Sequence, residues 1–213
     1  MKIAFIAVCL VHFHSTYGDF FVNPAYEPLL HNIFMTNGNY DDITINGIHF
    51  AGTRPWIIRW NMIKNACSYA NLKILDLGSL FGVNAVCLKK YGNAKSVTAV
   101  DCMESYLKQA ALLAKIFEVD INFIQADLDN PNDNYEQKIG TNYDVVFCLS
   151  VLFWVHDKDR LLKYLSNFNK VIFEGHGSAE VEEACFKQLG FDAKRLGVSE
   201  NGRSLFLFHK SKG

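Results

Sequence analysis

Three acidic residues each stand at the end of an apolar segment of the sequence. Asp76 closes the run that begins at residue 73, Asp101 ends residues 96–101, and Asp127 ends residues 121–127. Apolar runs of this length are typical of buried parallel strands, whose carboxyl ends meet at one edge of a sheet where ligands bind. The repetition at three strand ends indicates a binding site with three carboxylates.

Two glycines, Gly78 and Gly82, separate the first strand from the helix expected after it within residues 73–88. Gly78 permits a backbone conformation that a side chain would block, and Gly82 lets the helix begin close to a ligand. The spacing Asp76-x-Gly78-x-x-x-Gly82 has one glycine fewer than the dinucleotide-binding pattern, and its acid would repel a pyrophosphate but suit an ammonium group. Asp101 is placed to accept hydrogen bonds from ribose hydroxyls. A ligand with an ammonium group and a ribose but no phosphate is S-adenosylmethionine (SAM).

These features resemble class I, Rossmann-like SAM-dependent methyltransferases, and residues 53–210 can be laid on their pattern. The resemblance implies an α/β fold, a Rossmann-like three-layer sandwich whose seven-stranded, mostly parallel sheet has an antiparallel final strand. Further strands are expected at 143–150 and 171–174, a closing antiparallel pair at 191–196 and 204–208, and helices at 103–117, 161–168 and 179–189. We expect a methyltransferase domain at 53–213, preceded by an extension at 1–52 that helps to cover the cofactor.

The resemblance also implies which residues contact the cofactor. Asp127 would bind the adenine amine, with the backbone of Leu128 at a ring nitrogen. Arg54 would reach the methionine carboxylate or an anionic substrate from the start of a helix capped by Thr53, whereas Arg59 is expected to be a solvated charge. The predicted cofactor-binding set is Arg54, Asp76, Gly78, Ser79, Gly82, Asp101, Cys102, Asp127, Leu128 and Ser150. Leu80 replaces the central glycine of the family's turn, so its side chain must point away from the cofactor.

Methyl transfer to a hydroxyl group requires a base, and histidine suits this role near neutral pH. His156 follows the fourth strand and His176 the fifth, and we predict both as catalytic, with a structural role as the alternative for each. Glu174, also predicted as catalytic, either binds substrate or is a paired structural acid. Phe153 and Trp154 are expected to be pocket wall or core.

The bulk composition indicates one ordinary core and no polyanion-binding surface, since half of the 213 residues are hydrophobic and the net charge is −1. Six cysteines form no C-x-x-C pair and are interpreted as reduced thiols. Residues 1–18 have the layout of a secretory signal, with a short buried element as the alternative. Because the cofactor is intracellular, we expect a cytoplasmic protein, with secretion as the alternative.

The leading interpretation is a SAM-dependent methyltransferase that acts on an oxygen of a small molecule or glycan. We expect no DNA partner, because no Asp/Asn-Pro-Pro-aromatic motif follows the fourth strand, and no metal, because no carboxylate triad is evident. The alternatives are a catalytically silent SAM-binding interaction module and a tRNA-modifying methyltransferase. A nicotinamide oxidoreductase is disfavoured by the missing glycine and by Asp76. No membrane span is expected, and the sequence leaves the oligomeric state open.

Overall fold

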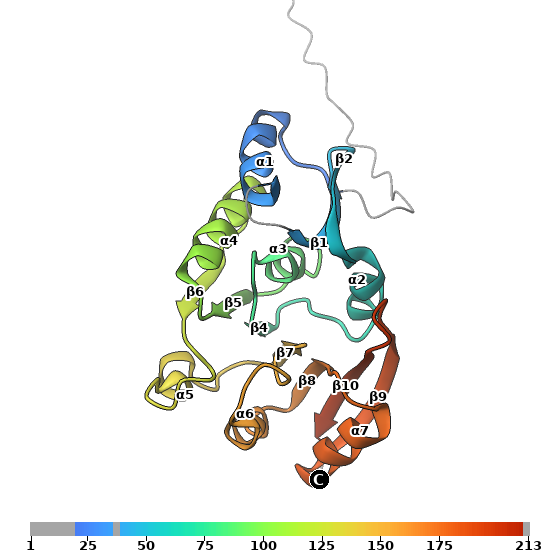
Figure 1. Cartoon of the computed structure of the whole chain (residues 1–213). Coiled ribbons are helices and arrows are strands. Elements are labelled where there is room, and N and C mark those ends of the chain that lie inside the picture. Colours follow the sequence, from blue (N-terminus) through green and yellow to red (C-terminus); the bar gives the residue numbers. More distant parts are fainter. Residues whose placement is uncertain (1–19, 36–38, 211–213) are drawn as a thin grey trace, which may run out of the picture.

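A computed structural model describes residues 20–35 and 39–210 of the chain (Figure 1). The candidate secretory signal at residues 1–18 lies outside these residues. In the described part of the chain, no helix is long and apolar enough to cross a membrane. The five described cysteines are free thiols.

A seven-stranded sheet forms the centre of the structure, with the strand order β6-β5-β4-β7-β8-β10-β9. Its strands are β4 (Lys73–Leu77), β5 (Ser96–Asp101), β6 (Asn122–Gln125), β7 (Val145–Leu149), β8 (Lys170–Glu174), β9 (Phe191–Val198) and β10 (Ser204–Lys210). Strands β6, β5, β4, β7 and β8 pair in parallel, whereas β10 is antiparallel to both β8 and β9. The predicted mostly parallel sheet with an antiparallel final strand is therefore confirmed.

Alternate side chains of the central strands enter two separate cores, one on each face of the sheet. Ile74 and Phe147 belong to the first core, and their neighbours Leu75 and Val146 belong to the second. Helices α2 (Trp56–Lys64), α3 (Val83–Lys90) and α4 (Glu104–Ile116) cover the first face, and helices α5 (Tyr135–Ile139), α6 (Lys158–Leu165) and α7 (Ala179–Gln188) cover the second (Figure 1). Burial on both faces explains why these strands are continuous apolar runs, and it gives the predicted three-layer sandwich.

The N-terminal part forms a second, three-stranded sheet with the order β2-β1-β3. The strands of this sheet are β1 (Asn39–Ile45), β2 (Ile48–Phe50) and β3 (Gly52–Pro55). They are preceded by η1 (Pro24–Tyr26) and α1 (Glu27–Met35), and α1 contacts α4 (Figure 1). Strand β1 is antiparallel to β2 and parallel to β3. The sequence indicated turns and extended pieces here but did not predict α1. Because β1 pairs with β3, the side chains of residues 40 and 41 lie near that of Arg54.

Three local predictions for helices differ from the structure. Thr53 does not cap α2, because its hydroxyl donates a hydrogen bond to the carbonyl of Tyr40. Arg59 is not solvated but only 4% exposed, since α2 buries positions 56, 59, 60 and 63, the i, i+3, i+4, i+7 spacing of one helix face. Helix α6 begins at residue 158, earlier than predicted, because Asp157 accepts a hydrogen bond from the backbone N–H of Arg160.

Candidate functional site

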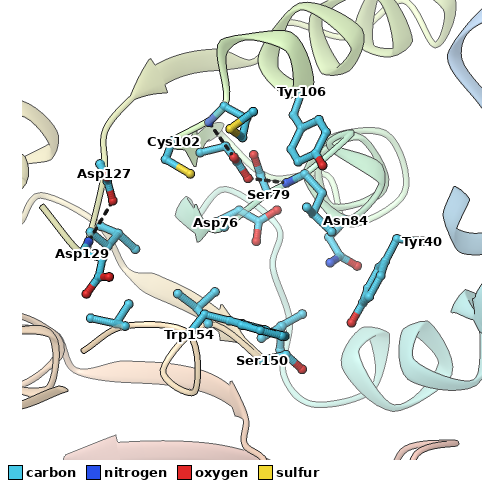
Figure 2. A pocket seen from close by; sticks show the side chains of 18 of the residues that line it. Tyr40, Asp76, Ser79, Asn84, Cys102, Tyr106, Asp127, Asp129, Ser150 and Trp154 are labelled. Atoms are coloured by element: carbon cyan, nitrogen blue, oxygen red, sulfur yellow. Dashed lines mark hydrogen bonds between the residues drawn. The ribbon is translucent and has the colours of Figure 1, made fainter. Parts of the chain in front are cut away.

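A cavity of about 550 Å³ lies at the carboxyl edge of the large sheet. It is lined by the loops that follow β4, β5, β6 and β7 and, on the other side, by β1 and α2. Figure 2 shows Asp76 in the middle of this space, with Asp127 and Asp129 at one end and Tyr40 and Asn84 at the other. The predicted site residues that line the cavity are Asp76, Gly78, Ser79, Asp101, Cys102, Asp127, Leu128 and Ser150.

The turn after β4 has the backbone conformation predicted from its glycines. Gly78 has a φ of +68°, and a Cβ atom there would lie 2.5 Å from the Cγ2 of Val151, so only glycine permits this close approach. Gly82 does not line the cavity. It packs so closely against α4 that a Cβ atom at this position would lie 2.8 Å from the Cβ of Ala110. Leu80 also has a positive φ, +47°, which costs a leucine about 1–2 kcal/mol. The turn therefore keeps its conformation without the central glycine.

Backbone amides hold two of the three predicted carboxylates, Asp101 and Asp127, in place. Asp101 accepts hydrogen bonds from the N–H groups of Leu80 and Met103, at 2.9 and 3.0 Å. Asp127 accepts one from the N–H of Asp129 at 3.0 Å, which is the turn contact expected of an aspartate there. Both side chains therefore occupy fixed positions on the cavity wall.

Three buried polar atoms on the cavity wall lack partners. Asp76 Oδ2, Ser79 Oγ and Arg59 Nε form no hydrogen bond with any described residue. Leaving a buried polar group unpaired costs about 1–3 kcal/mol, so such groups in one cavity indicate a polar ligand. A carboxylate and a guanidinium complement the ammonium and carboxylate groups of an amino acid. These residues therefore fit the methionine part of SAM.

Burial determines the electrostatics of this end of the cavity. It raises the pKa of Asp76 to about 7, with the neighbouring carboxylates of Asp101 and Asp41 adding to the effect and Arg59 opposing it. Burial also raises the pKa of Asp41, although Arg59 Nη2 lies 3.2 Å from its Oδ1. Desolvation outweighs the attraction of Arg59 for Asp76, and that of Arg59 and Arg54 for Asp41.

Arg54 lies behind the cavity wall, in a network that uses all of its donors. Its Nη2 and Nη1 bind the two carboxylate oxygens of Glu174 at 2.8 and 3.1 Å, and its Nε binds Glu200. Nη1 also donates to the Tyr40 hydroxyl at 2.7 Å, and Nη2 to Ser199 at 3.3 Å. Arg54 is 2% exposed and has no N–H left for a ligand. Its predicted contact with the methionine carboxylate is therefore not available in this arrangement.

Glu174 is paired with buried partners and is not brought to the cavity, so its catalytic role remains a prediction that this burial does not favour. It is fully buried and does not line the cavity. Burial alone would raise its pKa, but hydrogen bonds from Arg54 and Ser150 and the charge of Arg59 lower the pKa to about 2. Ser150 lines the cavity, yet its hydroxyl donates to Glu174 Oε2 at 2.5 Å and accepts from Arg203 Nη1 at 3.0 Å.

The two predicted catalytic histidines do not line the cavity. The side chain of His156 is 93% exposed, and its Nδ1 lies 2.5 Å from Oδ2 of Asp129, which does line the cavity. His176 is partly buried, and its ring stacks on that of Phe153 at 4.3 Å. The catalytic roles of both histidines remain predictions.

Several lining residues were not predicted as site residues: Tyr40, Asp41, Arg59, Asn84, Tyr106 and Asp129. The spacing 56, 59, 60, 63 is a signal that could have identified Arg59 as buried. Tyr40 and Asp41 reach the site through the pairing of β1 with β3, which leaves no local signal. The described residues contain no group of three or more His, Cys, Asp or Glu side chains that could hold a metal ion.

Known methyltransferases are similar to parts of this chain. A family described as a methyltransferase domain matches residues 74–175. A ubiquinone biosynthesis O-methyltransferase of Rickettsia canadensis is 30% identical over 128 residues, which is 60% of this chain and 49% of that protein. A release factor glutamine methyltransferase of Flavobacterium psychrophilum is 38% identical over 78 residues, 37% of this chain and 27% of that protein. The chain thus spans at most about half of these relatives.

Solved structures share the fold at low sequence identity. The N-terminal domain of EvdMO1, determined in the presence of S-adenosylhomocysteine (SAH) and D-fucose, has a TM-score of 0.67 at 14% identity, covering 90% of this chain and 98% of that one. The same domain with SAH bound has a TM-score of 0.65 at 13% identity, covering 87% and 96% of the two chains.

We expect the buried Arg54 network to be a large contributor to stability. Arg54→Met leaves the Glu174 carboxylate buried without its main partner, so the free energy of unfolding should fall by about 3–5 kcal/mol. The control is Lys108→Met, which removes a solvent-exposed pair with Glu104 and should cost about 0.3–0.5 kcal/mol. Urea unfolding of both variants measures the difference, and equal losses would contradict the assigned role.

We expect Asp76 to make stability depend on pH. Its pKa is higher in the folded chain than in the unfolded chain, so ionisation between about pH 4 and pH 7 destabilises the fold. Asp76→Asn removes this ionisation. The stability of the variant minus that of the wild type should therefore rise by roughly 3 kcal/mol between about pH 4 and pH 8. A difference that stays constant across this range would show that Asp76 titrates normally.

Proposed function

We propose that this chain is a class I, Rossmann-like methyltransferase that uses SAM, and that it methylates an oxygen atom of a small molecule or a glycan. The choice of oxygen is supported by the names of two relatives, which are ubiquinone biosynthesis O-methyltransferases. The glycan alternative is supported by the fold shared with a domain that was studied with D-fucose.

The three unpaired polar atoms in the cavity carry the proposed position of the cofactor. Asp76 would hold the ammonium group of the methionine part, and Arg59 would hold its carboxylate in place of Arg54. Asp101 would bind the ribose hydroxyls. Asp127 and Leu128 would contact the adenine at the other end of the cavity, as predicted from the sequence.

When bound, SAM supplies a methyl group activated by a sulfonium. The protein must align the acceptor oxygen, exclude water and remove a proton from the acceptor. We propose His156 as the group that accepts this proton at Nε2, because Asp129 on the cavity wall holds the opposite ring nitrogen. Glu174 is too deeply buried to share this role.

We expect SAH to bind the wild-type chain and to bind Asp101→Ala at least about tenfold more weakly, because the variant loses charged hydrogen bonds to the ribose. Calorimetry measures both affinities. Asp120→Ala, which removes an exposed carboxylate two residues before β6, is the matched control and should bind normally. A folded wild-type chain that does not bind SAH would contradict the proposal.

A methyl-transfer assay distinguishes an active enzyme from a catalytically silent binding module. Methyl transfer from labelled SAM to a panel of sugars and phenols should be detectable with the wild type and lost with Asp101→Ala. SAH binding without any transfer to this panel would favour the silent module.

We expect Arg59 to bind only the amino-acid part of the cofactor. Arg59→Met should weaken SAH binding about tenfold, because a carboxylate loses its cationic partner, and should leave binding of 5′-methylthioadenosine within about twofold. This second ligand has the nucleoside but lacks the amino-acid group, so it controls for collapse of the cavity. Equal losses for both ligands would contradict the assignment of Arg59.

A further inference from the structure

Three aromatic rings meet where the loops after β7 and β8 lie side by side. The Phe153 and His176 rings stack with centroids 4.3 Å apart and an interplanar angle of 8°, and the Trp154 ring stands edge-on to Phe153 at 5.1 Å and 88°. We call Phe153, Trp154 and His176 the aromatic platform. Trp154 lines the cavity, and Figure 2 places it along one side of the open space, opposite Tyr106 and Cys102.

Two of the three platform side chains, Phe153 and Trp154, are more than half exposed. Trp154 is 70% exposed and Phe153 is 54% exposed, whereas Trp56 and Trp60 are 1% and 6% exposed. A large aromatic side chain buries 150–250 Å² when it is covered, so leaving two of them in water forfeits about 1.5–3 kcal/mol each. Exposed aromatic rings at the edge of a ligand cavity indicate a surface that a ligand covers.

The loop that carries His176 is fastened to α7 through Glu182. Glu182 accepts a hydrogen bond from the backbone N–H of Gly177 at 2.8 Å. Glu182 packs so closely that a Cβ atom at Gly175 would lie 1.7 Å from its Oε1. Burial and the charge of Arg203 lower the pKa of His176, which favours the neutral form of the ring. The His176 side of the platform is therefore held against α7 and favours an uncharged partner.

We propose that the aromatic platform is the acceptor site and that it binds a hydroxylated ring with an apolar face, which stacks on Trp154. This inference rests on the proposed methyltransferase function and specifies its substrate class. A phenol and a pyranose sugar share this chemistry, because both present an apolar face and ring hydroxyls. Phe153 and Trp154 lie on the same loop as His156, the proposed base, so a ring stacked on Trp154 would be held near it.

Trp154 can report on its own occupancy, because it is the exposed tryptophan of the three in the chain. The SAH-saturated protein is titrated with catechol and, separately, with methyl α-D-fucopyranoside, while acrylamide quenching of tryptophan fluorescence is followed. We expect at least one ring probe to protect Trp154 in a saturable manner and glycerol, which has no ring, to give no protection. Catechol protection alone identifies a phenol acceptor, and fucoside protection alone identifies a sugar.

Variants test whether stacking is the cause. Calorimetry should show that Trp154→Ala binds the protecting probe at least about tenfold more weakly, while Trp154→Phe and the exposed-surface control Phe21→Ala stay within about threefold. SAH affinity should be unchanged in all three variants.

Three results would overturn the platform as the acceptor site. They are the absence of protection by both ring probes, equal probe binding by Trp154→Ala and Trp154→Phe, and a loss of SAH affinity in Trp154→Ala, which would assign the ring to the cofactor. Failure of the wild type to bind SAH is a separate result and would overturn the proposed function itself.

Discussion

The buried pair of Arg54 and Glu174 is the interaction on which the rest of the structure depends. It joins β3 of the small sheet to β8 of the large sheet, and Glu200 extends it to the hairpin of β9 and β10. Removing these charges from water is costly, and the cost is offset only because every guanidinium N–H has an acceptor. The protein itself uses all the donors of Arg54. Arg59 is the one cationic side chain among the described residues that line the cavity.

The cavity beside this network is arranged for a ligand at the expense of stability. The carboxylates of Asp41, Asp76 and Asp101 are buried close together, and the two described arginines near them cannot keep the pKa of Asp76 low. A ligand with an ammonium group would supply the missing positive charge and the missing hydrogen bonds. The proposed cofactor therefore restores the interactions that the free chain lacks.

The two halves of the large sheet contribute different surfaces to the site. The strand ends of β4, β5 and β6 supply the acids and backbone amides proposed for the cofactor, whereas the loops after β7 and β8 supply the aromatic platform. The small N-terminal sheet covers the cavity from the other side through Tyr40 and Asp41. This division would let the acceptor surface change while the cofactor end keeps its geometry.

The sequence by itself determined the large sheet and the polar residues at its strand ends. Apolar runs buried on both faces, the glycine turn at Gly78 and the acids at 76, 101 and 127 are local patterns, and local patterns can be read along the chain. Only the tertiary structure decided that Arg54 is structural, that Arg59 faces the cavity and that Glu174 is paired. Arg54 and Glu174 are 120 positions apart, and Tyr40 reaches the site through strand pairing. Whether a charge binds a ligand or another residue depends on such distant partners, because the free energy of a buried charge is set by what surrounds it.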